Sequence, residues 1–357
     1  MNEWIHGICA VIFALLLAFT TTPAVRALAY KLGAIDVPRD NRRMHTKPIP
    51  RIGGLAIYFA FVVSTLVFSK LSHGLAAIYI GGTLIVIVGI IDDIKAINAW
   101  SKLAAQIVAA VIAVLCGVRM DFINLFGKYI NFGYLAIPIT VLWIVGLTNA
   151  INLIDGLDGL ACGVSAIGSL SLFFIMLIKG DTASALVTAV LAASCIGFLP
   201  FNSNPAKIFM GDTGALFLGF TLAVMSVEGV FKLHAVLSFM IPIAIFGMPL
   251  LDTATAFTRR LLHHKSPFSP DKKHFHHRLI ALGFSQKQSV YTIYAICAML
   301  GLAAVMLSSG NNVGALVILG VGLAVLAVYY LLVTKFTDLA KLGFTTEVGS
   351  EKSKDEK

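Results

Sequence analysis

The sequence predicts an all-α membrane protein with ten or eleven membrane-spanning helices. Of its 357 residues, 58% are hydrophobic and 13% are charged, and the mean hydropathy is +0.89. A soluble domain carries about 25% charged residues, so this composition excludes an ordinary soluble globular protein. Apolar runs long enough to cross a bilayer, which takes about 17 to 25 residues, recur along the chain. We therefore expect a polytopic membrane protein.

The apolar runs predict the helices in order. The first, near 5–28, is expected to be a permanent helix, because no small-residue cleavage site of a signal peptide is evident. The runs 160–178 and 182–200 are separated only by Lys179-Gly180-Asp181, so ten helices is the alternative to eleven. Residues 1–334 are expected to form one transmembrane domain, and 335–357 a polar, disordered cytoplasmic tail. The other helices are expected near 52–69, 76–92, 103–118, 134–150, 213–229, 234–257, 291–308 and 313–333.

The distribution of positive charge predicts the orientation. With the N-terminus outside, all but five of the 27 Lys and Arg residues fall in cytoplasmic segments. Because Lys and Arg are retained on the cytoplasmic side, we expect an outer N-terminus and a cytoplasmic C-terminus. The net charge of +9 suits anionic membrane lipid and does not require nucleic acid, so membrane lipid is an expected partner and nucleic acid is not.

Nearly all polar clusters fall on the expected cytoplasmic face, which is where we expect the active site. In the segment that follows the apolar run 134–147, Asn149, Asn152 and Asp155 recur every third residue and would form one slanting stripe on a helix. Asp158 lies beyond a glycine, where the helix is expected to stop or bend. Carboxylate and amide oxygens suit Mg2+, which retains waters and shares its coordination sphere with phosphate. A hydrogen-bonded cluster between helices is the alternative.

Two further carboxylate motifs lie at expected helix ends. Asp92 and Asp93 end the third helix, and because neighbouring helical side chains point about 100° apart, one is expected to bind and the other to orient. A polar cap of the helix is the alternative. Asp212 lies between glycines at the start of an apolar helix, so it is a metal ligand or an N-cap, and a phosphate could also use that helix N-terminus.

Basic residues form a third group, in the loop 258–290 and before Gly53-Gly54. The loop carries five histidines and several Lys and Arg residues but no cysteine, so we expect it to bind anions. A zinc site and simple positive-inside anchoring are the alternatives. For the segment before Gly53-Gly54, which contains Lys47, surface anchoring is the default interpretation.

Taken together, four motifs resemble the polyprenyl-phosphate N-acetylhexosamine-1-phosphate transferases of glycosyltransferase family 4. They are Asp92-Asp93, the run from Asn149 to Gly159, Gly211-Asp212-Thr213-Gly214 and His274-Phe275-His276-His277-Arg278-Leu279. Their order and spacing match across almost the whole chain. The resemblance implies transfer of a sugar 1-phosphate from a UDP-sugar to a polyprenyl phosphate, with release of UMP. It also implies Mg2+ as the cofactor, with Mn2+ as an alternative ion.

The likeness is closest to the bacterial undecaprenyl-phosphate N-acetylglucosaminyl 1-phosphate transferases, which start wall teichoic acid, O-antigen or related glycans. The branch that makes the muramyl-pentapeptide lipid typically has three consecutive histidines, whereas only His276 and His277 are consecutive here. The resemblance therefore favours UDP-N-acetylglucosamine as donor and undecaprenyl phosphate as acceptor. Both substrates imply the cytoplasmic membrane of a bacterium. The oligomeric state, a homodimer included, stays open.

The resemblance implies a role for each candidate residue. Asn152 and Asp212 would hold the metal. Asp92 or Asp93 would lie near the acceptor phosphate, and Asp155, the third catalytic candidate, would line the sugar-phosphate pocket. The residues expected to bind substrate are Lys47, Lys102, Asn149, Asp158, His274, His276, His277 and Arg278.

Two questions about mechanism and class stay open at this point. The sequence does not separate direct transfer from a two-step route through a covalent phosphosugar. A cation- or proton-coupled transporter is a rival class, although its acidic residues would lie near the bilayer midplane and not at helix ends. A lipid-binding scaffold without catalysis is the third class, and it would not require oxygen ligands beside basic residues.

Overall fold

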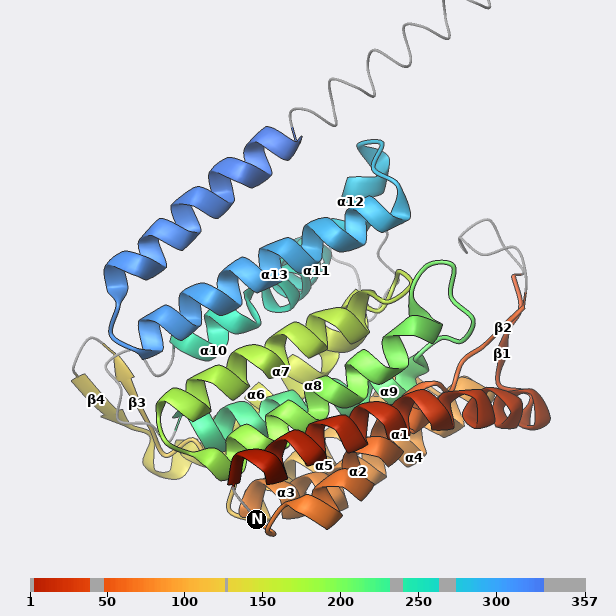
Figure 1. The fold of residues 1–357 in the computed structure, drawn as a ribbon, viewed down its shortest axis with the longest axis horizontal. Helices are drawn as coiled ribbons and strands as arrows, with labels where there is room; N and C mark the ends of the chain where they lie inside the picture. Colours follow the sequence, from red (N-terminus) through yellow and green to blue (C-terminus); the bar gives the residue numbers. More distant parts are fainter. Residues whose placement is uncertain (1–2, 39–47, 126–127, 232–239, 263–273, 331–357) are drawn as a thin grey trace, which may run out of the picture.

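The structure is a computed structural model and describes residues 3–38, 48–125, 128–231, 240–262 and 274–330. Nearly all of this part is helical, which confirms the predicted all-α polytopic membrane fold (Figure 1). Two shorter apolar helices, Gly54–Phe68 and Ala99–Leu115, accompany the long ones. Within the described residues, seven helices are long and apolar enough to cross a membrane: Trp4–Leu32, His73–Ile94, Gly133–Ile154, Leu160–Ile178, Thr182–Asn202, Gln286–Ser308 and Asn312–Tyr330.

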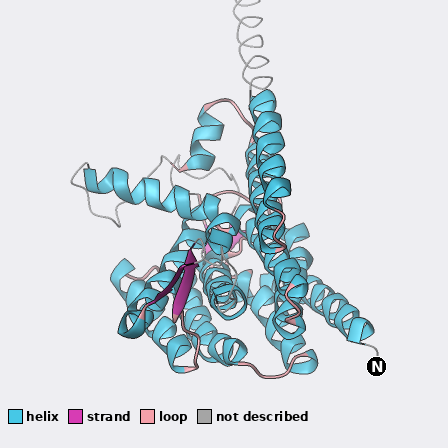
Figure 2. Cartoon of the chain, turned by 90° about the vertical axis from the view of Figure 1, so that its left-hand side faces the viewer, coloured by secondary structure: helices cyan, strands magenta, loops and turns pink. Residues whose placement is uncertain are grey.

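The elements follow the predicted order. The first helices are α1 (Glu3–Leu32), α2 (Gly54–Phe68), α3 (His73–Ala77), α4 (Thr83–Ile94), α5 (Ala99–Leu115) and α6 (Ala136–Ile154), and a π-helical turn, Ile78–Gly82, joins α3 to α4. The later helices are α7 (Leu160–Ile178), α8 (Thr182–Asn202), α9 (Gly211–Ser226), α10 (Met240–Ile245), α11 (Gly247–Leu262), α12 (Phe275–Ala281) and α13 (Gln286–Ser308). Two antiparallel pairs, β1 (Ile35–Asp36) with β2 (Ile49–Pro50) and β3 (Phe122–Leu125) with β4 (Lys128–Asn131), account for the strands of the described part (Figure 2).

The predicted helix 234–257 is interrupted. Its described part forms two helices, α10 and α11, which are separated at Phe246. Pro249, in the first turn of α11, has no N–H to donate to the carbonyl of Ile245, the last residue of α10. The helix α12 and the hairpin β3–β4 were not predicted from the sequence, because neither is an apolar run of membrane-spanning length.

Glycines allow three helices to touch through their backbones at one end of the bundle. There α9 packs against α2 and α4. A Cβ atom at Gly54 would lie 2.1 Å from the Cα atom of Gly214, and one at Gly89 would lie 2.5 Å from the Cα atom of Thr213. Protein Cβ atoms essentially never approach other atoms below 3.0 Å, so only glycine fits at Gly54 and Gly89. The starts of α2 and α9 and the last turns of α4 are therefore held together without intervening side chains.

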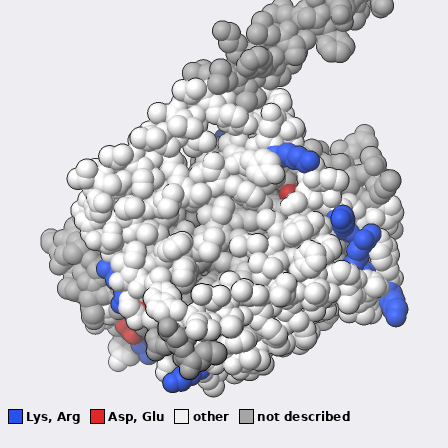
Figure 3. Space-filling model, in the orientation of Figure 1, with Lys and Arg blue, Asp and Glu red and all other residues white. Residues whose placement is uncertain are grey.

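Charged side chains are sparse along the flank of the bundle. In the space-filling view, Lys and Arg gather at the two ends of the molecule and leave a broad uncharged surface between them (Figure 3). Such a surface matches a hydrocarbon environment, where charge is costly. The chain is therefore a multi-pass membrane protein.

Candidate active site

A cavity of about 360 Å3 lies where α6 ends and α9 begins. It collects side chains from several separate motifs. The predicted metal ligands Asn152 and Asp212 both line it, although they are far apart in the sequence. The full lining comprises Asp36, Arg51, Asn152, Asp155, Gly156, Leu157, Asp158, Asn202, Phe209, Met210, Gly211, Asp212, His277 and Gln286.

Asp93 holds the start of α9 from the neighbouring helix α4. Its carboxylate accepts hydrogen bonds from the backbone N–H of Asp212 at 3.1 Å, and from the N–H and the hydroxyl of Thr213 at 3.0 and 2.7 Å. Arg51 Nη2 lies 3.4 Å from the same carboxylate. Only 6% of Asp93 is exposed, and both of its oxygens are engaged by donors. Asp93 therefore orients Asp212, and the N-cap of α9 is Met210 and not Asp212.

Lys102, on the first turn of α5, bridges two carboxylates. Its Nζ atom lies 3.1 Å from Asp92 Oδ2 and 2.9 Å from Asp212 Oδ2. Asp92 also accepts a hydrogen bond of 2.8 Å from the backbone N–H of Ile97. Charge-assisted contacts of this length are the stronger kind of hydrogen bond in proteins. The lysine thus places a single positive charge between the ends of α4 and α9.

Asp155 follows the last residue of α6 and lies in a strongly negative environment. Burial raises the pKa of the Asp155 carboxyl to about 8, and the negative charges of Asp212 and Asp93 act in the same direction. Arg51 opposes this shift. A cavity that crowds carboxylates in this way favours a divalent cation, because the ion would reverse the electrostatic cost of ionising Asp155.

The donor chemistry of the cavity fits magnesium better than zinc. Among the described residues, no group of three or more His, Cys, Asp and Glu side chains is arranged to hold a metal ion. An ion beside Asp212 would need amide, water or phosphate oxygens as further ligands, and Asn152 and Asp155 offer oxygen ligands in the same cavity. Mg2+ usually keeps several waters and binds through one or two carboxylates, whereas structural zinc takes a closed set of Cys and His ligands.

The end of the polar stripe turns around two glycines. Asp158 lines the cavity and accepts hydrogen bonds from Asn204 Nδ2 at 2.9 Å and from the Ala206 N–H at 3.0 Å. Gly159 starts α7 in the left-handed region, with φ of 78°, and its carbonyl accepts a 2.6 Å bond from the Tyr294 hydroxyl. These contacts fix the direction of Asp158, which the helical stripe did not predict.

Asn149 lies about one helical turn before Asn152 on α6, further from the cavity than the other members of the stripe. Its amide pairs with the side chain of Gln106 on α5, and its Nδ2 atom donates to the carbonyl of Val145 at 2.8 Å. It is not among the residues that line the cavity. Asn149 therefore joins α5 to α6, the kind of interhelical bond that was the alternative interpretation for this stripe.

The histidine motif meets the cavity through α12. Asp252 of α11 lies 2.8 Å from His274 Nδ1, and it accepts a second 2.8 Å bond from the backbone N–H of Phe275. The His274 and His276 rings are stacked, with centroids 5.9 Å apart and an interplanar angle of 3°. His276 packs against Gly156, since a Cβ atom there would lie 2.5 Å from His276 Nε2.

His276 is 3% exposed, and its Nε2 atom has no hydrogen-bond partner in the described part of the chain. Burial, followed by the charges of His277 and His274, lowers the pKa of the His276 imidazole to about 4, while Asp252 acts in the opposite direction. His276 is therefore neutral at physiological pH. Of the motif, His277 lines the cavity, whereas Arg278 is exposed on α12. Lys47 lies outside the described residues.

Sequence reasoning missed two charged residues that organise this region. Arg51 faces Asp93 and the cavity, but its position in a basic loop suggested only surface anchoring. Asp252 was not singled out, although an acidic residue within the predicted span 234–257 is a signal of function in membrane proteins.

Comparison with known proteins matches this chain to one family. Residues 75–230 match the model described as Glycosyl transferase family 4. A Bacillus subtilis (strain 168) protein named probable undecaprenyl-phosphate N-acetylglucosaminyl 1-phosphate transferase is 42% identical over 314 residues, which cover 87% of each chain. A Mycolicibacterium smegmatis decaprenyl-phosphate N-acetylglucosaminephosphotransferase is 36% identical over 79% of this chain and 77% of its own. An Escherichia coli (strain K12) undecaprenyl-phosphate alpha-N-acetylglucosaminyl 1-phosphate transferase is 29% identical over 77% of both chains.

Proposed function

This chain belongs to glycosyl transferase family 4, and on that premise we propose that it transfers N-acetylglucosamine 1-phosphate from UDP-N-acetylglucosamine to undecaprenyl phosphate. An oxygen of the acceptor phosphate attacks the phosphorus that carries the sugar. The bond from that phosphorus to the oxygen of UMP breaks, UMP leaves, and undecaprenyl-diphospho-N-acetylglucosamine forms. The observation that carries the proposal is the single cavity that collects Asn152, Asp155 and Asp212 beside Arg51.

We assign Mg2+ to Asn152 and Asp212, with Asp155 beside them. The oxygen-only donor set and the raised pKa of Asp155 support a divalent cation in this cavity. When bound, Mg2+ supplies positive charge that lowers the repulsion between two phosphate groups during transfer. The contribution of Asp93 is to hold the backbone of Asp212 in position through the contacts described above.

The protein has little need of a strong base, because a phosphate monoester with a second pKa near 6 is mostly ionised at neutral pH. Its main task is to bring an anionic nucleophile up to an anionic diphosphate. We assign phosphate binding to Lys102 and Arg51, and to Lys47. Asp92 is the carboxylate nearest the acceptor in this proposal, because it shares the Lys102 ammonium group with Asp212, whereas the oxygens of Asp93 hold the start of α9. UMP release from donor alone would indicate a covalent phosphosugar on the protein, and dependence on the acceptor would indicate direct transfer.

Donor recognition is assigned to the rim of the cavity. Asp158 and His277 line it, and the His276 ring, whose centroid lies 4.3 Å from that of His277, packs against His277. Because the nucleotide sugar is cytoplasmic, we infer that this end of the bundle faces the cytoplasm of a bacterium, with the N-terminus outside. The product would start a cell-envelope glycan such as wall teichoic acid or O-antigen.

Purified protein, Mg2+, undecaprenyl phosphate and a panel of UDP-sugars provide the test, with UMP release as the readout. We expect release with UDP-N-acetylglucosamine and loss of release when the metal is chelated. Asp212→Asn should lower the rate by at least about 100-fold, the scale seen when a main electrostatic contact to the transition state is removed. Asp121→Asn is the matched control, because Asp121 is an exposed acid beside the β3–β4 hairpin.

Two outcomes would reject parts of the proposal. If no UDP-sugar yields UMP with Mg2+ or Mn2+, the reaction itself is wrong. If Asp212→Asn and the control Asp121→Asn both retain near-normal rates, the metal assignment is wrong but the proposed reaction still stands.

A further inference from the structure

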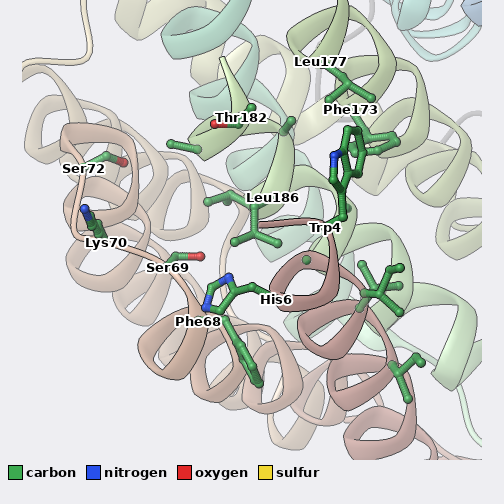
Figure 4. Close-up of a pocket in the computed structure, with 18 residues that line it drawn as sticks. Trp4, His6, Phe68, Ser69, Lys70, Ser72, Phe173, Leu177, Thr182 and Leu186 are labelled. Atoms are coloured by element: carbon green, nitrogen blue, oxygen red, sulfur yellow. The ribbon is translucent and has the colours of Figure 1, made fainter. Parts of the chain in front are cut away.

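A second cavity, of about 590 Å3, lies between the start of α1 and the start of α8 (Figure 4). It is bounded by the start of α1, the end of α2, the end of α7 and the start of α8. These helices carry the candidate active site, or segments next to it, at their other ends. Its volume lies within the range of about 300 to 1,000 Å3 that is typical of sites for small molecules.

One side of this cavity is polar and carries a positive charge. Ser69, Lys70 and Ser72 lie along it, in the short connection between α2 and α3 (Figure 4). The Ser69 hydroxyl is buried and has no hydrogen-bond partner in the described part of the chain. The Ser72 hydroxyl accepts a bond from the Leu75 N–H and caps α3. A hydroxyl donor without a protein partner, on a cavity wall that also carries a lysine, is suited to a phosphate oxygen.

The residues that line the cavity include no Asp or Glu. Asp181 precedes the lining residue Thr182, but its carboxylate accepts from the Ser184 N–H as the N-cap of α8. The polar side therefore presents net positive charge to the cavity and favours an anionic ligand.

The remaining walls are apolar and aromatic. Trp4, Phe173 and Leu177 lie across the cavity from Lys70 (Figure 4). Phe68 closes the wall between α1 and α2, where its ring lies 5.4 Å from the His6 ring. A hydrocarbon chain would bury apolar surface here. Trp4, which is 67% exposed, lies in the first turn of α1, and tryptophan is enriched where membrane helices end.

We propose that this cavity binds one anionic membrane phospholipid, with an acyl chain between α1 and α8 and the headgroup phosphate at the Ser69 hydroxyl and the Lys70 ammonium group. The acceptor lipid of the proposed reaction is a poor occupant, because its phosphate must reach the far end of the bundle. The 30-residue helix α1 that separates the two ends is about 45 Å long. A second copy of the chain would cover the apolar wall but would not supply a phosphate for Ser69 and Lys70.

Fluorescence of Trp4 gives a direct test. The chain has three tryptophans, so Trp100→Phe and Trp143→Phe leave Trp4 as the reporter. This protein is reconstituted in phosphatidylcholine nanodiscs that contain increasing small fractions of either bromine-labelled phosphatidylglycerol or bromine-labelled phosphatidylcholine. We expect labelled phosphatidylglycerol to quench Trp4 at a concentration about fivefold lower than labelled phosphatidylcholine does, which is the preference that one Lys near the membrane surface provides.

Three variants separate a bound lipid from the surrounding bilayer. Lys70→Gln should abolish the preference for phosphatidylglycerol. Lys179→Gln is the matched control, because Lys179 is an exposed cation at the same end of the bundle but does not line the cavity. Gly7→Leu should reduce quenching by both lipids without unfolding the protein, because Gly7 lines the cavity and a Cβ atom there has no neighbour within 4 Å.

Equal quenching by the two lipids, or a preference that survives Lys70→Gln, would overturn the proposal and leave only contact with bulk lipid. Absence of quenching by either lipid would also overturn it, since another protein surface would then cover Trp4. None of these readouts depends on enzymatic activity, so the proposal stands or falls separately from the proposed reaction.

Discussion

Gly156 is the position where one added methyl group is expected to disturb the candidate active site. It lines the cavity and faces the buried ring of His276. In Gly156→Ala the new Cβ atom would lie 2.5 Å from His276 Nε2 and 2.8 Å from its Cε1, whereas ordinary contacts begin at 3.4 Å. The ring therefore has to retreat by roughly 1 Å, a displacement that can lower catalytic rate by about 100-fold when it misplaces a positioning group.

We expect kcat/KM for UMP release to fall by about 10- to 100-fold in Gly156→Ala, with a loss of stability of about 1 to 3 kcal/mol from overpacking. Gly146→Ala provides a matched control on α6, since a Cβ atom at Gly146 has no neighbour within 4 Å. That variant should keep its activity and unfold at an equal or slightly higher temperature.

A double mutant tests whether the contact with His276 is the cause. If it is, Gly156→Ala combined with His276→Ala should lose no more activity than His276→Ala alone, because the clash has been removed. Additive losses, or full activity in Gly156→Ala, would refute the steric argument.

Three other changes have expected outcomes. Asp252→Asn should lower kcat/KM by about 10- to 100-fold, because a charge-assisted bond to His274 worth about 1.5 to 3 kcal/mol is weakened; steady-state UMP release measures this, and an unchanged value would show that Asp252 does not position the histidines. The free energy of unfolding should increase between pH 4 and pH 6.5, because the pKa of His276 is about 4 in the fold and about 6.5 when unfolded, so the unfolded state binds more protons in this window. Thermal unfolding in detergent across these pH values measures the slope, and a slope that persists unaltered in His276→Gln would contradict the assignment. Gly54→Ala should lower the unfolding temperature far more than Gly320→Ala, since the first would place a Cβ atom 2.1 Å from the backbone of α9 and the second meets open space; equal unfolding temperatures would disprove the backbone contact.

The sequence predicted the helices and several of the polar residues that line the cavity, because both depend on local patterns. Long apolar runs identify spans, and polar motifs at the ends of those runs brought Asn152, Asp155 and Asp212 into one cavity without knowledge of their contacts. Periodicity placed Asn149 in the same stripe, but the residue pairs with Gln106 on α5 and does not line the cavity.

Contacts between distant segments could not be predicted in this way. Arg51 meets Asp93 because α2 and α4 both approach α9 through glycines, and Asp252 meets His274 because α11 passes the start of α12. The break between α10 and α11 could have been predicted from Pro249, which cannot donate a helical hydrogen bond to the carbonyl of Ile245. The high hydropathy of the run 234–257 instead suggested one continuous helix.

The backbone contacts among α2, α4 and α9 divide the cavity into a fixed part and an adjustable part. Asp93 lies on α4 and Asp212 on α9, and these two helices touch through their backbones. Ordinary side-chain substitutions therefore cannot change the distance between the two acids. Asp158 and His277, in contrast, are carried by the turn before α7 and by α12, which contact the cavity through side chains. With the roles proposed above, a change of sugar donor within this architecture would be made at the rim, while the fold itself would keep the centre unchanged.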